Sequence, residues 1–149
     1  MNDYNNYPDV DVALGEWESA ISPQTIGTTA LGPCIGVVLY GNTSKEGYVG
    51  HFVDAFSQEE DVNQMIAAAL HNNDSLDVVA WLFGGCTYAD DDAPSRKSTK
   101  NTRRAIKQTL EGQGIVALHE QWNNNGDCYI GVILDCETGE VSTQTHFID

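Results

Sequence analysis

The chain has few basic residues. Lysine and arginine number 7 together against 22 aspartates and glutamates, which gives a formal net charge of −15 over 149 residues. A field of that sign repels phosphate backbones, so it argues against nucleic acid and anionic membranes as partners. The sequence also lacks any apolar run near the ~20 residues that a membrane-spanning helix needs. We therefore expect neither a nucleic-acid partner nor membrane insertion.

Three further features are missing. The stretch 1–17 has no positively charged side chain and no continuous apolar core, so we do not expect a secretory signal. We therefore expect a cytoplasmic location. The 4 cysteines form no CxxC pair, which favours reduced thiols. No His/Cys group has zinc-ligand spacing, and the acidic run at 90–92 lacks the glycine and distal glutamate of a calcium loop.

The composition is that of a globular protein, with 41% apolar and 19% charged residues. Residues 1–11 are polar and are expected to be flexible, and residues 12–149 are expected to form a single domain. The alternation and turn signals predict strands at 12–17, within 18–33, and at 34–40, 47–53, 78–83, 115–122, 128–135 and 140–147.

Two helices are predicted. The first begins at a capping box formed by Ser57 and Glu60, and the second covers 98–110. The apolar stripe of the first helix consists of Val62, Met65, Ile66, Ala69 and Leu70. Because strands outnumber helices, the sequence predicts an α+β fold with helices packed outside a largely antiparallel sheet system.

Cys34 follows a glycine-proline turn and opens an apolar strand. If Asn42 and Thr43 form a two-residue turn, Cys34 directly faces His51, with Cβ atoms ~4.5–5.5 Å apart. A looser turn places His51 opposite Val37 instead, and the sequence leaves both registers open. An opposed imidazolium would lower the thiol pKa and suit acyl transfer, whereas the alternative is an ordinary buried cysteine. Gly36, on the same strand face, would leave room for a substrate.

The segments "TTALGPC", "IGVVLYG" and "GHF" resemble the chemoreceptor glutamine deamidase family CheD. The hallmark of that family is a stretch close to TLGLGSC, a valine-rich strand and then a histidine. Thr28, Cys34 and His51 occupy its threonine, cysteine and histidine positions. The flanking segments "LGEW", "LFGGCTY" and "LDCETGEV" extend the resemblance over about residues 12–145.

The resemblance implies that Cys34 is the nucleophile, His51 the general acid and base, and Thr28 the residue that orients His51. It implies hydrolysis of a glutamine side chain in a protein, with chemoreceptor helices as the substrate and a chemotaxis phosphatase as a partner. It also implies a fold shared with the catalytic domain of cytotoxic necrotizing factor toxins, a mixed β-sandwich with helices outside. No metal or organic cofactor is implied.

The chain departs from the family at Pro33, which replaces the usual serine, at residues 52–58, and in the acidic loop 86–101. Two rival readings therefore stay open. One is a different thiol hydrolase, a deamidase of another protein or a transglutaminase-like enzyme. The other is a binding module without catalytic activity that keeps the fold.

Overall fold

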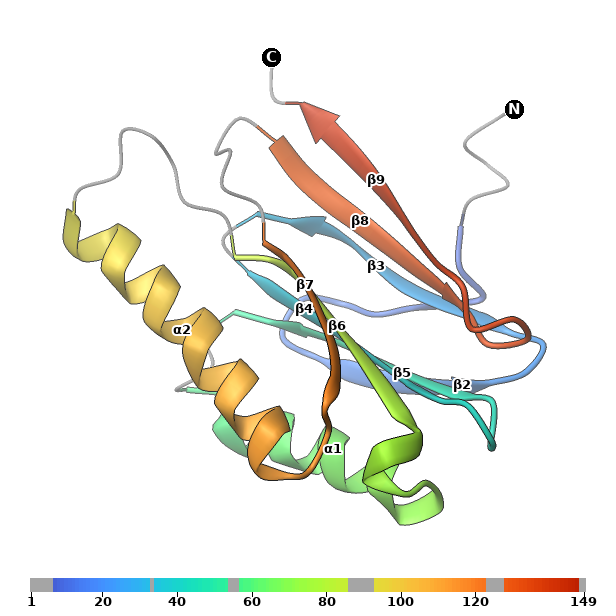
Figure 1. Ribbon diagram of the computed structural model, residues 1–149. Helices are drawn as coiled ribbons and strands as arrows, with labels where there is room; N and C mark the ends of the chain where they lie inside the picture. The colour runs from blue at the N-terminus through green and yellow to red at the C-terminus, as the bar shows by residue number, and fades with distance from the viewer. Residues whose placement is uncertain (1–6, 33, 54–56, 86–92, 123–127, 148–149) are drawn as a thin grey trace.

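Two β-sheets and two long helices make up the described part of the chain. The computed structural model describes residues 7–32, 34–53, 57–85, 93–122 and 128–147 (Figure 1). The strands are β1 (Val10–Asp11), β2 (Trp17–Ile21), β3 (Thr25–Leu31), β4 (Ile35–Gly41), β5 (Glu46–Phe52), β6 (Val78–Gly84), β7 (Ala117–Trp122), β8 (Cys128–Asp135) and β9 (Val141–Phe147). The helices are α1 (Glu59–Asn72), the short 3₁₀ helix η2 (Ser75–Asp77) and α2 (Ala93–Gly112).

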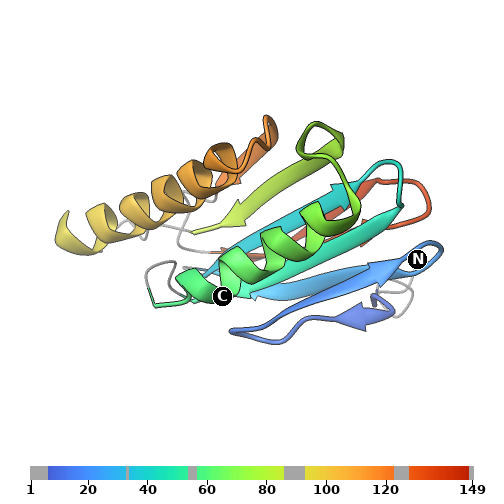
Figure 2. The same ribbon diagram turned by 90° about the horizontal axis from the view of Figure 1, so that it is seen from below.

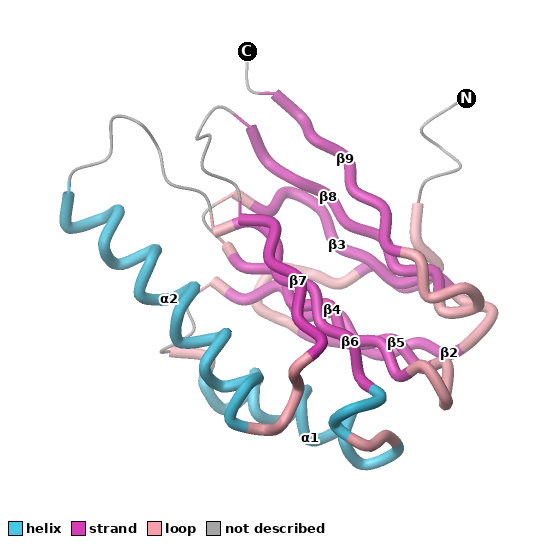
Figure 3. Tube along the Cα trace, in the orientation of Figure 1, coloured by secondary structure: helices cyan, strands magenta, loops and turns pink. Residues whose placement is uncertain are grey.

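The sheets are largely antiparallel. A five-stranded sheet has the order β2-β5-β4-β6-β7, and a four-stranded sheet has the order β1-β3-β8-β9. Only the pairs β6–β7 and β1–β3 are parallel among the described strands. Both long helices lie on the outer side of the five-stranded sheet (Figures 2 and 3). These observations confirm the predicted α+β class, with mixed sheets and helices outside.

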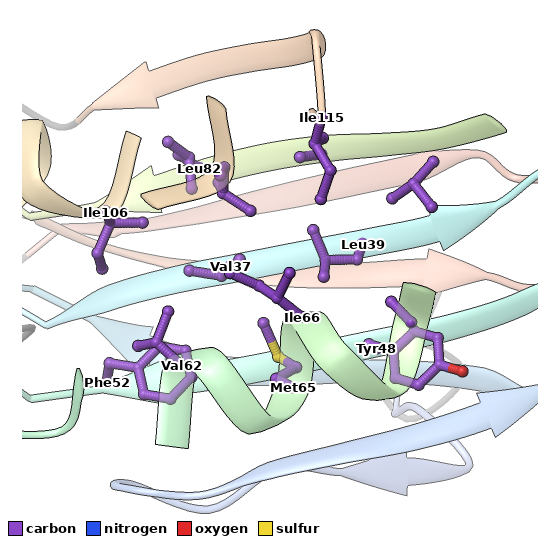
Figure 4. Packing of buried hydrophobic residues seen from close by; sticks show 14 of the residues in the cluster. Val37, Leu39, Tyr48, Phe52, Val62, Met65, Ile66, Leu82, Ile106 and Ile115 are labelled. Atoms are coloured by element: carbon purple, nitrogen blue, oxygen red, sulfur yellow. The ribbon is translucent and has the colours of Figure 1, made fainter. Parts of the chain in front are cut away.

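The sequence of β4 is apolar throughout because both faces of the strand are buried. Every residue of this strand is buried, and its side chains alternate between two cores. Val37 and Leu39 point to the helices, where they meet Met65 and Ile66 of α1 (Figure 4). Val38 points to the other sheet and shares a core with residues such as Leu31. The strand that follows Cys34 is therefore held from both sides.

The boundaries correct several expectations. The strand predicted over 12–17 is wrong, because residues 12–16 connect β1 to β2. The capping box is also wrong: Gln58 is the N-cap residue of α1, and its side chain makes no cap hydrogen bond. That amide instead accepts from the Val53 N–H at 2.7 Å and donates to the Gly15 carbonyl at 2.8 Å. α2 begins at Ala93, earlier than the predicted 98.

We expect the core on the helix side to dominate stability. Leu82 of β6 is 0% exposed, whereas Leu76 is 77% exposed. Leu82→Ala should lower the free energy of unfolding by about 2–5 kcal/mol, through lost burial and the cavity left behind. The same substitution at Leu76 should change it by less than about 0.5 kcal/mol. Urea denaturation measures both, and equal effects would contradict the assigned core.

Candidate active site

The β4–β5 connection sets the position of His51. Gly41 pairs with Glu46, so residues 42–45 form a four-residue turn, in which Lys45 has a φ of 57°. His51 consequently pairs with Gly36. Both predicted registers are therefore wrong: His51 is directly opposite neither Cys34 nor Val37. The left-handed turn residue was not recognisable, because lysine rarely adopts that conformation.

The side chain of His51 enters the space between the two sheets. It lies on the same strand face as Val49, which belongs to the inter-sheet core. There Nδ1 lies 2.7 Å from Oγ1 of Thr28, a residue of β3 in the opposite sheet. Thr28 and His51 are 1% and 4% exposed. The predicted contact between Thr28 and the imidazole is therefore present, and it joins the two layers of the sandwich.

The hydrogen bonds around Thr28 determine the protonation of the His51 ring. The Thr28 hydroxyl donates its proton to the backbone carbonyl of Val12 at 2.8 Å. A hydroxyl has one proton, so towards His51 the threonine oxygen must accept. The imidazole therefore carries its proton on Nδ1, and Nε2 presents a lone pair. Nε2 is buried and has no hydrogen-bond partner among the described residues.

The backbone of His51 is held as firmly as its ring. Its N–H donates to the Glu16 carbonyl at 2.9 Å, and its carbonyl accepts from the Gly15 N–H at 2.8 Å. The carbonyl of Gly15 in turn accepts from the Gln58 amide. The segment between β1 and β2 thus positions both the ring and the backbone of His51. Val12 acts on the ring through Thr28, and Gly15 binds the backbone carbonyl directly. The roles of Val12 and Gln58 were not predicted, because a backbone carbonyl leaves no sequence signal and the Gln58 amide reaches Gly15 only in the folded chain.

Cys34 is anchored by the end of β6. Its carbonyl accepts from the Gly85 N–H at 2.8 Å. Gly84 has a φ of +77°, and a Cβ at that position would lie 2.5 Å from the Cys34 carbonyl oxygen. A side chain there would push Cys34 away. The glycine pair that follows the predicted strand 78–83 therefore fixes the backbone of the candidate nucleophile.

Arg103 of α2 supports this anchor from outside. Its Nε donates to the Gly85 carbonyl at 2.9 Å, and its guanidinium lies 5.3 Å from the centre of the Trp122 ring. Such stacking contributes about 0.5–2 kcal/mol. One side chain thus connects α2, the edge strand β7 and the Gly85 turn beside Cys34. The role of Arg103 was not predicted.

The side chains of Cys34 and His51 both lie in the layer between the two sheets, but they make no hydrogen bond with each other. Cys34 is half-buried and packs against the inter-sheet core. It precedes Gly36, the pairing partner of His51, by two positions. In a regular antiparallel pair such diagonal neighbours lie roughly 7–8 Å apart. The structure therefore brings Thr28 and His51 into contact and places Cys34 diagonally across the strand pair from His51.

The protonation of the thiol also differs from the expectation. Burial raises the pKa of the Cys34 thiol and lowers the pKa of the His51 imidazole. Both shifts favour neutral groups, because each disfavours the charged form. The directions of both shifts are opposite to those expected for a thiolate–imidazolium pair, and they favour a neutral thiol and a neutral base.

Gly36 does not open the site. A Cβ at this position would lie 2.6 Å from Cδ1 of Leu31, so the space above the glycine is already filled by β3. The expectation that Gly36 leaves room for a substrate is wrong. Its small size instead allows the two sheets to approach beside His51.

The remaining candidates lie elsewhere. Cys136 is buried, and burial raises its thiol pKa to about 11. His71, His119 and His146 are exposed. Pro33 and Cys86 lie outside the described residues. In the described ranges there is no cluster of histidine, cysteine, aspartate or glutamate that could hold a metal ion, and no helix long and apolar enough to cross a membrane.

No family model matches this chain, but a curated protein and a solved structure are among those similar to it. A probable chemoreceptor glutamine deamidase CheD from Zymomonas mobilis is 29% identical over 100 residues, which cover 56% of this chain and 53% of that protein. The match thus spans about half the length of the curated relative. The crystal structure of the hypothetical protein YfiH from Bacillus licheniformis aligns with a TM-score of 0.57 at 10% identity, over 73% of this chain and 51% of that one. This second likeness concerns the fold alone.

The His51 tautomer can be checked directly. Nitrogen-detected NMR of histidine-labelled protein should show His51 protonated at Nδ1, with a ring pKa below the ordinary value of about 6.5. Thr28→Val, which removes the acceptor and keeps the shape, should shift the tautomer equilibrium. An Nε2-protonated ring in the unsubstituted protein would contradict the assignment, and exposed His71 serves as the reference.

The neutral thiol predicts a characteristic reactivity. Labelling of Cys34 by iodoacetamide should rise about tenfold per pH unit between pH 6.5 and 8.5, because only the thiolate reacts and its pKa lies above that range. Cys136, with the higher pKa and deeper burial, should react more slowly throughout. A rate for Cys34 that is already level near pH 7 would show a preformed thiolate.

Proposed function

We propose that the protein is a cysteine-dependent hydrolase that deamidates a glutamine side chain of another protein. The observation that carries the proposal is the buried base: Thr28 holds His51 in the layer that Cys34 packs against, and no described residue hydrogen-bonds its Nε2 lone pair. The similarity to a probable chemoreceptor glutamine deamidase supports the choice of glutamine. Cys34 is assigned as nucleophile, His51 as acid and base, and Thr28 as the residue that orients His51.

The reaction begins from neutral groups. Sγ of Cys34 attacks the carboxamide carbon of glutamine while its proton passes to Nε2 of His51. The imidazolium then donates that proton to the amide nitrogen, and the C–N bond breaks. Ammonia is released, and the acyl group remains bound to Cys34 as a thioester. Water attacks the thioester as Nε2 takes its proton, and the thiol departs with the proton returned. Glutamate is the product, and the enzyme is restored.

Thr28 serves this cycle by keeping one orientation of the ring. As the imidazolium forms, Nδ1–H remains directed at the threonine oxygen, and the hydroxyl remains directed at the Val12 carbonyl. The relay has no carboxylate, so it stabilises the cation weakly. A base with a lowered pKa and a weak relay suits a mechanism in which the proton is held only briefly.

Thiol and base must approach for the first step. Catalytic hydrogen bonds are often long in the unliganded protein and tighten when substrate binds. A buried nitrogen without a partner costs about 1–3 kcal/mol, so closing the distance from Nε2 to Sγ recovers free energy. Substrate binding that shifts Cys34 by a rotamer change would supply that closure.

The target and the setting are part of the same proposal. The curated relative is named for chemoreceptors, which supports a chemoreceptor as the protein substrate. A chemotaxis phosphatase as a partner and a cytoplasmic location are proposed with it, on the resemblance at Thr28, Cys34 and His51. A non-catalytic binding module is the second candidate. It is favoured by one observation, the absence of a hydrogen bond between His51 and Cys34 in the described structure.

The test is mass spectrometry of glutamine-containing receptor helices after incubation with the protein. The unsubstituted protein should add about one dalton per converted glutamine and release ammonia, and Cys34→Ala should do neither. Thr28→Val should slow turnover by roughly 5- to 150-fold, the equivalent of one lost hydrogen bond of about 1–3 kcal/mol. Thr28→Ser keeps the hydroxyl and should retain most activity. If Thr28→Val is as active as the unsubstituted protein, the orienting role is wrong.

A further inference from the structure

The positive charge of this acidic protein is concentrated on one helix. Six of the 7 lysines and arginines lie in α2: Arg96, Lys97, Lys100, Arg103, Arg104 and Lys107. The helix has one acidic residue, Glu111, so 21 of the 22 acids lie elsewhere with a single cation, Lys45. At about 100° per residue these six positions fall within roughly a third of the helix circumference. The spacing therefore gathers the cations on one side of α2.

Two of these cations are available to a partner. Lys100 and Arg104 are exposed, lie one turn apart, and have no salt bridge to any residue in the described ranges. Lys107 is already paired with Glu120 at 3.1 Å, and Arg103 is engaged with Gly85 and Trp122. Arg103 and Lys107 of the helix thus bind neighbouring parts of the fold, whereas Lys100 and Arg104 face solvent.

The charged helix lies beside the candidate site. Arg103, which neighbours Arg104 in sequence, donates to the Gly85 carbonyl, and the Gly85 N–H donates to the Cys34 carbonyl. Two hydrogen bonds therefore connect α2 to the backbone of Cys34. Lys45 lies in the β4–β5 turn, at the opposite end of the sheet from this region (Figure 1). The helix that carries six of the 7 cations is therefore connected to the backbone of the candidate nucleophile.

We infer that Lys100 and Arg104 dock an acidic segment of the protein substrate, so that a glutamine flanked by carboxylates is presented to Cys34. The inference rests on the proposed function for the identity of the substrate. Its support is charge complementarity: an acidic partner is repelled by the acidic remainder of the protein and attracted at α2, which carries six of the 7 cations, so the field selects the docking orientation. A nucleic acid is less favoured, because its extended phosphate backbone would meet the 21 acids outside the helix.

The experiment uses two synthetic helical peptides that contain one glutamine. In one the neighbouring positions are glutamate, and in the other they are lysine. Fluorescence anisotropy gives the dissociation constant with the full chain, and ammonia release gives kcat/KM. The matched variants are Lys100→Gln with Arg104→Gln, and Lys45→Glu alone. Each lowers the net charge by the same amount, so they separate location from total charge.

The acidic peptide should bind the unsubstituted protein at least about tenfold more tightly than the basic one, and added salt should weaken it. The double variant should lose about tenfold in affinity, whereas Lys45→Glu should change it by less than about twofold. Equal losses in the two variants, a preference for the basic peptide, or tighter binding of a DNA duplex at the same salt would overturn the inference. Selective binding without ammonia release from either peptide would contradict the deamidase proposal and leave the docking surface standing.

Discussion

The hydrogen bond between Thr28 and His51 is the constraint on which the site depends. It crosses the sandwich, from β3 in one sheet to β5 in the other, in a layer where nearly every other contact is apolar. A polar pair in such surroundings must satisfy its protons internally, and the Val12 carbonyl completes the chain of donors and acceptors. This arrangement leaves the ring nitrogen Nε2 without a hydrogen-bond partner in the part of the chain that the structure describes. A buried base that is oriented but unengaged is difficult to explain by stability alone, because the missing partner costs free energy.

Close backbone packing keeps the other half of the site in place. Gly84 lets the end of β6 approach the carbonyl of Cys34, and Gly36 lets Leu31 fill the space beside His51. Arg103 then fastens the Gly85 turn from outside. The thiol is thus held by its backbone, while burial raises the pKa of its side chain and favours the neutral form. Fold and chemistry are linked here by backbone contacts more than by charged pairs.

Much of this architecture could be predicted from the sequence. The apolar run of β4, the helical stripe of α1 and the strands 128–135 and 140–147 follow from periodicity, and the threonine contact with His51 followed from the resemblance at Thr28. Other features depend on tertiary context. The register of His51 is set by a left-handed Lys45, and Gln58 binds Val53 and Gly15 because the folded chain brings them together. The pKa of Cys34 is raised and the pKa of His51 is lowered, which is opposite to the directions expected for a hydrogen-bonded thiolate–imidazolium pair. Burial causes both shifts, and the two side chains make no hydrogen bond with each other.

The central claim is that Cys34 attacks a glutamine amide with His51 as its base. Intact-protein mass spectrometry of an acid-quenched reaction tests it most directly, because a thioester survives in acid. With a glutamine-containing acidic helix as substrate, we expect a transient adduct on Cys34 with the mass of the peptide minus ammonia, strongly reduced in His51→Ala. If no adduct forms on Cys34 while iodoacetamide still labels that thiol, the claim is contradicted and the protein is a binding module.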